Sequence, residues 1–131
     1  MKLLLDTHIA LWAIADDSRL PKEARELIAD PDNDKFVSVA SIWEIAIKHA
    51  AQKRGVGRMP ISGAEAVEHF DEAGYQVLPI TASHAAAIDR LPPHHADPFD
   101  RMLVAQALEE PLRLLTHDKR LAAYSDTMIL V

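Results

Sequence analysis

The chain has 131 residues, of which 49% are hydrophobic and 26% charged, a composition typical of one globular domain. It has no cysteine, which excludes disulfides and thiolate metal sites, and its formal charge of −6 argues against a protein that binds nucleic acid simply through a basic surface. No apolar run approaches the ~20 residues of a membrane span, and the N-terminus is too soon charged for a signal peptide, so we expect a single cytoplasmic domain over residues 1–131 with no membrane contact.

Apolar runs typical of strands alternate along the chain with stretches of helical periodicity. Residues 2–6 form a continuous apolar run that ends at Asp6, as a buried parallel strand would. Helical spacing follows over residues 9–17, and Pro21 opens a short amphipathic helix in the first helical position, which tolerates proline. Residues 35–39 are predicted to form the second strand.

The rest of the chain continues the same alternation. The elements that we expect are a long helix over residues 40–54 ended by Gly55 and Gly57, a helix near 62–73, a strand in 75–80, a helix over 81–91 capped by Thr81, a helix that begins at Asp97, a strand over 113–116, a short helix from Asp118 and a terminal strand over 127–131. This alternation predicts an α/β domain whose mainly parallel sheet is covered by helices on both faces. In such folds the site lies beyond the carboxyl ends of the strands.

Five acidic residues fall at predicted strand ends or near helix starts: Asp6, Glu44, Asp97, Asp100 and Asp118. Each also suits an ordinary structural role. Asp6 and Asp118 fit helix N-caps, Asp97 and Asp100 fit the N-cap and third position of a helix that begins with proline, and Glu44 is spaced to pair with Lys48 on a helix surface.

Four of these carboxylates, those of Asp6, Glu44, Asp100 and Asp118, are expected on the same side of a parallel sheet. Converging carboxylates repel and raise one another's pKa unless cations hold them. Oxygen ligands without cysteine favour Mg²⁺ or Mn²⁺ over zinc, and such ions promote phosphodiester hydrolysis. The spacing alone leaves helix capping and metal-dependent hydrolysis both open.

Four segments of the chain carry a family resemblance: LLLDTHIALW at the start, VSVASIWEIAIK in the first third, and HHADPFDRMLVAQAL and LLTHDKRL near the end. They resemble the motifs of PIN-domain proteins, in particular the VapC-type toxins of prokaryotic toxin–antitoxin modules. The resemblance covers nearly the whole chain, including motif order. An aspartate and threonine after an apolar strand are weak by themselves, whereas DPFDRMLVAQA followed by LLTHD is highly specific.

The resemblance implies a three-layer α/β/α sandwich with a central, mainly parallel sheet of about five strands. It also implies an endoribonuclease that depends on Mg²⁺ or Mn²⁺ and acts as the toxin of a toxin–antitoxin system, with transfer RNA as the first substrate to consider. We expect a metal-activated water to leave a 5′-phosphate and a 3′-hydroxyl. The implied partners are RNA, a cognate antitoxin, a second copy of the chain in a homodimer, and a larger toxin–antitoxin assembly.

Carried over residue by residue, Asp6, Glu44, Asp100 and Asp118 match the four acidic positions of the family, so the resemblance implies that they are catalytic and hold the metal. Thr7 and Thr116 match supporting hydroxyl positions, and Asp97 lies ahead of the core motif, where a capping role suits it. No acidic position departs from the pattern.

Several basic side chains and one histidine are candidates for contact with RNA: Lys48, Lys53, Arg54, Arg58, His95, Arg101 and Lys119. The stretch from Lys48 to Arg58 equally suits a solvated helix end, where the dipole favours cations. Arg101 and Lys119 are each next to a proposed ligand and could pair with the acids instead. The adjacent His94 and His95 point in different directions, and no histidine set has zinc-ligand spacing.

Apolar residues of the two tryptophan-containing helices are expected in the core: Ile9, Leu11, Trp12, Trp43, Ile45 and Ile47. Any that are exposed would suit a partner surface.

Three other functions are less well supported by the sequence. A phospho-accepting receiver domain is also a small α/β protein with an acidic pocket, but the chain has one acid at the end of the first strand and no aspartate in its second strand. An aspartate-based phosphatase would need a second acid where His8 stands. A PIN domain that binds without catalysis is opposed by the complete acidic set.

Overall fold

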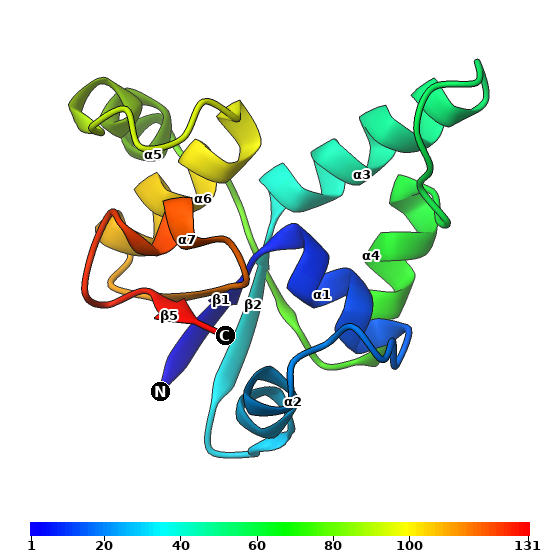
Figure 1. The fold of residues 1–131 in the computed structure, drawn as a ribbon, viewed down its shortest axis with the longest axis horizontal. Coiled ribbons are helices and arrows are strands. Elements are labelled where there is room, and N and C mark those ends of the chain that lie inside the picture. The colour runs from blue at the N-terminus through cyan, green and yellow to red at the C-terminus, as the bar shows by residue number, and fades with distance from the viewer.

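A fully parallel sheet of five strands forms the centre of the computed structural model, which describes residues 1–131 (Figure 1). The strands are β1 (Lys2–Leu5), β2 (Asp34–Ser38), β3 (Gln76–Leu78), β4 (Arg113–Thr116) and β5 (Ile129–Leu130), in the order β3-β2-β1-β4-β5. β1 is central and pairs with β2 through Leu3 and Lys35, and with β4 through Leu4 and Leu114. The expected number of strands is confirmed, and every pairing is parallel.

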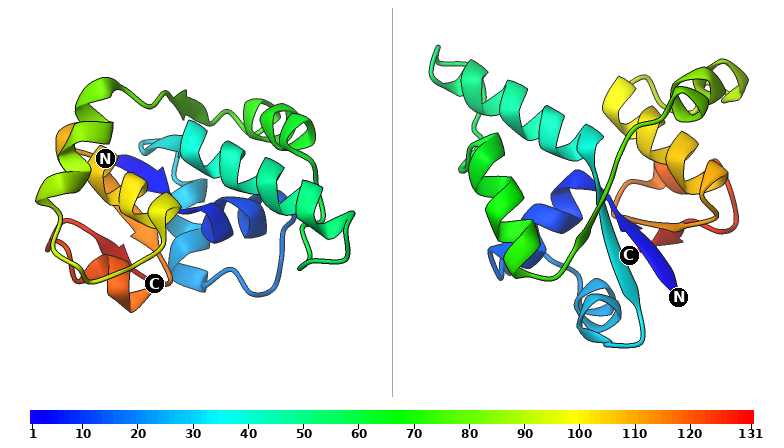
Figure 2. Two further views of the ribbon diagram at one scale, coloured as in Figure 1. Left: turned by 90° about the horizontal axis from the view of Figure 1, so that it is seen from above. Right: turned by 180° about the vertical axis from the view of Figure 1, so that it is seen from behind.

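Two groups of helices cover the two faces of this sheet (Figure 2). On one side lie α1 (Thr7–Ile14), α2 (Lys22–Ala29), α3 (Val39–Gln52) and α4 (Gly63–Glu72); on the other lie α5 (Ala82–Ala87), the 3₁₀ turn η1 (Ile88–Arg90), α6 (Pro98–Glu109) and α7 (Lys119–Ala122). The three-layer α/β/α sandwich is therefore confirmed.

Each face of the sheet has its own hydrophobic core, and β1 contributes to both. Leu3 and Leu5 are buried against the layer of α1 to α4, whereas Leu4 is buried against α6 and α7. Successive strand residues point to opposite faces. A strand covered on both sides must therefore be apolar throughout, which is why β1 is a run of leucines.

The observed elements differ from the predicted ones mainly at their ends. Pro21 is the N-cap of α2 rather than its first helical residue, and α1 begins at Thr7 directly after β1. The predicted helix over 81–91 divides into α5 and η1, and only two residues of the predicted terminal strand pair with β4. No helix has both the length and the apolar character that would let it cross a membrane.

Candidate functional site

Asp6 lies where β1 ends and α1 begins. One carboxylate oxygen accepts the amide N–H of Ile9 at 2.8 Å and so caps α1, as the sequence predicts. The other accepts the hydroxyl of Thr116 at 2.6 Å. Burial raises the pKa of the Asp6 carboxyl, although the bonds from Thr116 and Ile9 oppose that shift. Asp6 thus combines a structural cap with a carboxylate oxygen directed toward the end of β4.

Thr116 links the carboxyl ends of β1 and β4. Its hydroxyl donates to Asp6 and accepts the amide N–H of Asp118 at 3.0 Å. Asp118 in turn caps α7 by accepting the amide N–H of Arg120 at 2.9 Å. The hydroxyl of Thr116 is bonded to the Asp6 carboxylate and to the backbone amide of Asp118, so Thr116 fixes the two aspartates relative to each other.

Arg120 binds the Asp118 carboxylate with both arms of its guanidinium. Nε lies 3.2 Å from Oδ1 and Nη2 lies 2.9 Å from Oδ2. These bonds lower the pKa of Asp118 to about 2, so it is ionised at neutral pH. Arg120 is not among the site residues predicted from the sequence. A cation two residues after a capping aspartate was the available signal, since that spacing recurs at Asp17 and Arg19.

Asp97 and Asp100 open α6 with separate roles. Asp97 accepts the amide N–H groups of Phe99 and Asp100 at 2.9 and 3.0 Å, which confirms it as the N-cap before Pro98. Burial, followed by the charges of Asp97, Glu44, Asp6 and Asp118, raises the pKa of Asp100 to about 7. The charges of the other four acids therefore act together on the carboxyl group of Asp100.

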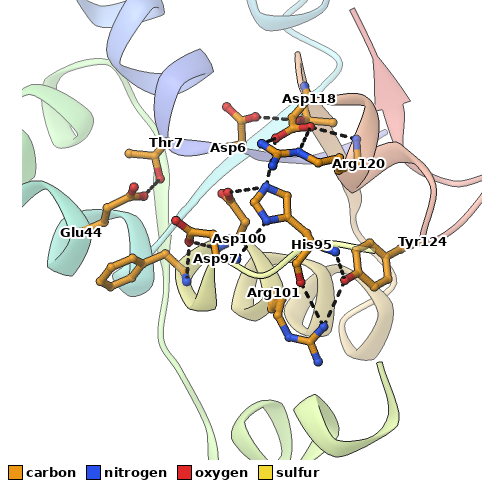
Figure 3. A network of polar contacts seen from close by, with 12 residues as sticks. Asp6, Thr7, Glu44, His95, Asp97, Asp100, Arg101, Asp118, Arg120 and Tyr124 are labelled. Carbon is orange, nitrogen blue, oxygen red and sulfur yellow. Dashed lines mark hydrogen bonds and ion pairs between the residues drawn. The ribbon is translucent and has the colours of Figure 1, made fainter. Parts of the chain in front are cut away.

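His95 is buried between two of the acids (Figure 3). Its Nδ1 accepts the amide N–H of Asp97 at 3.0 Å, so the ring proton lies on Nε2. Nε2 is 3.1 Å from Oδ2 of Asp118 and 3.2 Å from Oδ2 of Asp100. The predicted contact of His95 with RNA is not available in this arrangement, because both ring nitrogens are engaged inside the protein.

Glu44 is buried on the α3 side of the cluster, with only 4% of its surface exposed. It accepts the hydroxyl of Thr7 at 2.7 Å and the ammonium of Lys48 at 2.6 Å. The predicted Glu44–Lys48 pair is present, but the expectation that it decorates the helix surface is wrong for Glu44. The hydroxyl of Thr7 also lies 2.9 Å from the hydroxyl of Ser41, so the face of α3 that carries Ser41 and Glu44 is turned toward α1 and the site.

The acids therefore gather at the carboxyl ends of β1 and β4 and at the starts of α6 and α7, with Glu44 approaching from α3 (Figure 3). Ligand atoms of His95, Asp100 and Asp118 lie within 4.8 Å of one another. The donor set is mainly carboxylate oxygen, the kind that Mg²⁺ and Mn²⁺ prefer. His95 itself would have to release the Asp97 amide before Nε2 could bind a metal.

The other predicted RNA contacts fall into two groups. Arg101 donates to the carbonyl oxygens of Pro92 and His95 and to the hydroxyl of Tyr124, so it braces the loop before α6 and forms no ion pair with the acids. Exposed side chains that form no salt bridge are Lys53, Arg54, Arg58 and Lys119.

The predicted core residues also divide. Ile9 and Ile45 are buried, and Leu11 and Trp12 are half-buried against the same core. Trp43 and Ile47, however, are 56% and 44% exposed. They lie on the face of α3 opposite the buried Glu44 and Ile45, so the expectation that they belong to the core is wrong.

Residues 3–126 match the PIN domain family. The chain is 33% identical over 124 residues to Ribonuclease VapC22 of Mycobacterium tuberculosis, covering 93% of this chain and 91% of that protein. Its fold resembles the DNA-bound VapBC complex of Salmonella typhimurium, with a TM-score of 0.67 at 18% identity over 100% of this chain and 97% of the other. It also resembles VapBC2 of Rickettsia felis bound to a promoter DNA fragment, with a TM-score of 0.63 at 18% identity over 100% and 98% of the two chains. The chain belongs to the PIN domain family, as a protein of the VapC type.

Proposed function

We propose that this protein is a metal-dependent endoribonuclease that acts as the toxin of a toxin–antitoxin system. The observation that carries the proposal is the convergence of Asp6, Asp100 and Asp118 at one edge of the sheet, with the pKa of Asp100 raised to about 7. The name of the related ribonuclease from Mycobacterium tuberculosis supports RNA as the substrate.

Asp6, Asp100, Asp118 and Glu44 are the residues that would hold Mg²⁺ or Mn²⁺. The crowding that raises the pKa of Asp100 is relieved by a divalent cation, so the donor set fits such an ion. When bound, the ion supplies positive charge to the phosphodiester and activates water. Thr116 and Thr7 orient two of the carboxylates through their hydroxyls.

His95 has a positioning role in this proposal. Its Nε2–H bridges Asp100 and Asp118, and its Nδ1 is fixed by the helix start of α6. The ring therefore keeps two acids from different elements close together, where their mutual repulsion would otherwise favour separation.

The partners we propose are RNA, with transfer RNA first, and a cognate antitoxin, all in the cytoplasm. The VapBC composition of the similar structures supports an antitoxin. We also propose a homodimer, and a larger assembly with the antitoxin. Support for a second copy comes from Val39, Trp43 and Ile47, three exposed apolar residues spaced four apart on α3.

Cleavage of RNA by the purified protein tests the enzymatic proposal. Wild-type protein is expected to cut RNA in the presence of Mg²⁺ or Mn²⁺ and to leave 5′-phosphate and 3′-hydroxyl ends. The Asp6→Asn variant keeps an N-cap acceptor for α1, so it should fold and lose cleavage by at least ~100-fold. Recovery of 2′,3′-cyclic ends would contradict the proposed attack by water, and a fully active Asp6→Asn variant would contradict the site.

Growth of cells that express the protein without its antitoxin tests the toxin proposal separately. Induction of the wild-type chain should arrest growth, whereas induction of Asp100→Asn should not. Unimpaired growth at equal levels of folded wild-type protein would refute the toxin role. It would not refute the nuclease activity, which the cleavage assay tests separately.

A further inference from the structure

A cluster of rings and one guanidinium lies on α1 and at the end of β4, next to the acids. The centroid of the Trp12 ring is 5.9 Å from that of His8 and 6.0 Å from that of His117. The guanidinium carbon of Arg19 lies 5.5 Å from the Trp12 ring centroid and is held there by two bonds to Asp17. His8 and His117 are exposed, and Trp12 is half-buried.

This ring cluster borders the acidic site directly. Asp6, Trp12 and Asp118 line one open hollow of about 600 Å³, together with both histidines, Lys119 and Arg120. Trp12 and His8 also line a second hollow of about 280 Å³ between α1 and the segment before α4, which extends to Arg58 and His69. A molecule bound on the rings would thus be continuous with one bound at the carboxylates.

Cations near the rings can meet an anionic ligand even though the chain as a whole is acidic. Asp17 is neutralised by Arg19, and Asp118 by Arg120. Lys119 and Arg58 form no salt bridge, so the ammonium of Lys119 at the larger hollow, which Asp6 also lines, and the guanidinium of Arg58 at the smaller one are free to bind a phosphate. Flat rings beside free cations suit the base and the phosphate of a nucleotide, respectively.

We infer that the cluster of His8, Trp12, Arg19 and His117 is a binding subsite for one unpaired nucleotide of the RNA substrate, whose base packs on the rings while Lys119 meets its phosphate. This inference rests on the proposed nuclease function and adds a requirement to it: the RNA must be single-stranded beside the cleaved bond. A paired base has its faces stacked in the helix and cannot reach the rings.

A protein segment is the competing occupant of these hollows. The nucleotide is favoured because the hollow at Trp12 opens onto Asp6 and Asp118 and because its free cation stands next to Asp118. A substrate strand must pass from the subsite to the carboxylates, so the nucleotide uses this continuity directly.

Fluorescence of Trp12 tests the subsite. The chain has two tryptophans, so Trp43→Phe leaves Trp12 as the only emitter, and added Asp100→Asn prevents cleavage. A single-stranded octaribonucleotide in Mg²⁺ is expected to change the emission, and the same strand annealed to its complement is not. The cognate antitoxin proposed above serves as the competing ligand.

Affinity for the labelled octamer, measured by anisotropy, should fall by about 5- to 100-fold in Trp12→Leu and less in Trp12→Phe, which retains a ring. If Trp12→Leu fails to fold, His8→Ala takes its place in the affinity measurement, because His8 is exposed. His49→Ala on α3 is the matched control and should bind as the parent does. In the active protein, Trp12→Leu should raise KM far more than it lowers kcat.

Wild-type cleavage combined with unchanged Trp12 emission and unchanged affinity of Trp12→Leu and His8→Ala would overturn the subsite and leave the nuclease intact. An emission change caused by the antitoxin but not by RNA would overturn it in favour of a protein contact. Absence of any cleavage by wild-type protein, with the emission change and affinity losses present, would refute the nuclease and still support a nucleotide site.

Discussion

Asp100 is the residue at which the electrostatics of the molecule are concentrated. Burial and four neighbouring carboxylates raise its pKa from 3.8 to about 7. Asp118 lies on the other side of the His95 ring, and Arg120 lowers its pKa to about 2. Two carboxyl groups that contact His95 therefore differ in protonation near pH 6, because Asp100 is buried among other carboxylates whereas Asp118 is paired with Arg120.

The raised pKa of Asp100 predicts a pH-dependent gain in stability when its charge is removed. The folded state binds the Asp100 proton more tightly than the unfolded state, so this group destabilises the fold progressively as the pH rises from about 4 to 7. Without divalent metal, Asp100→Asn should raise the free energy of unfolding by about 1 to 3 kcal/mol at pH 8 and by far less at pH 4.

Urea unfolding in EDTA at both pH values measures this difference. Asp126→Asn, at an exposed position without a hydrogen bond or salt bridge from its side chain, is the matched control and should show no such trend. An equal gain at pH 4 and pH 8 would show that the effect of Asp100→Asn is not electrostatic. Asp118 does not disturb the comparison, because its stabilising contribution, which is lost as the pH falls from about 4 to about 2, is common to the wild type and the variant.

At the start of α6, Asp97 both caps the helix and places a negative charge near Asp100. The cap comes from two hydrogen bonds to the amides of Phe99 and Asp100. The charge is the largest contribution of any single neighbour to the raised pKa of Asp100.

Two substitutions of Asp97 separate these roles. Asp97→Ala should lower the free energy of unfolding by about 1 kcal/mol, because α6 loses its cap. Asp97→Asn keeps a capping oxygen and should cost little, while both variants lower the pKa of Asp100. Thermal unfolding and an NMR titration of the Asp100 carboxyl measure the two effects. An unchanged pKa of Asp100 in Asp97→Asn would contradict the proposed coupling.

Local signals at the element scale allowed much of the site to be predicted. A strand end or a helix start is encoded within a few residues, so the caps at Asp6, Asp97 and Asp118 follow from the sequence. The role of His95 and the burial of Glu44 do not follow in the same way. The role of His95 depends on Asp118, 23 residues away, and the burial of Glu44 depends on Thr7, 37 residues away.

The orientation of α3 was not predictable for a related reason. Its sequence is apolar around most of the helix, so periodicity does not determine which face is buried. The structure buries the face with Ser41 and Glu44, since Thr7 on α1 supplies their polar partner, and leaves Trp43 and Ile47 in solvent.

At the scale of the whole molecule, the alternation of strands and helices was sufficient to predict the layers and the parallel sheet, because both faces of a parallel sheet must be covered. It could not predict which surface meets another molecule. The exposed stripe of Val39, Trp43 and Ile47 is unusual for a helix surface, and Trp43 packs edge-on to Phe99 at 5.0 Å beside the site.

This stripe predicts the position of a homodimer interface. Ile47→Asp should shift the protein from dimer to monomer without unfolding it, because the side chain is 44% exposed within one chain. Val67→Asp on α4, also 44% exposed, is the matched control and should remain dimeric. Sedimentation velocity distinguishes the species. A dimeric Ile47→Asp variant, or a monomeric wild type at micromolar concentration, would place the interface elsewhere or remove it.

The most direct test of the acidic site is the recovery of RNA cleavage when divalent metal is restored to protein stripped with EDTA. The wild-type chain should be inactive after stripping and regain cleavage on addition of Mg²⁺ or Mn²⁺, whereas Asp100→Asn should stay folded and inactive in both conditions. Cleavage by the stripped wild-type protein in EDTA, or full activity of Asp100→Asn with metal, would contradict the account.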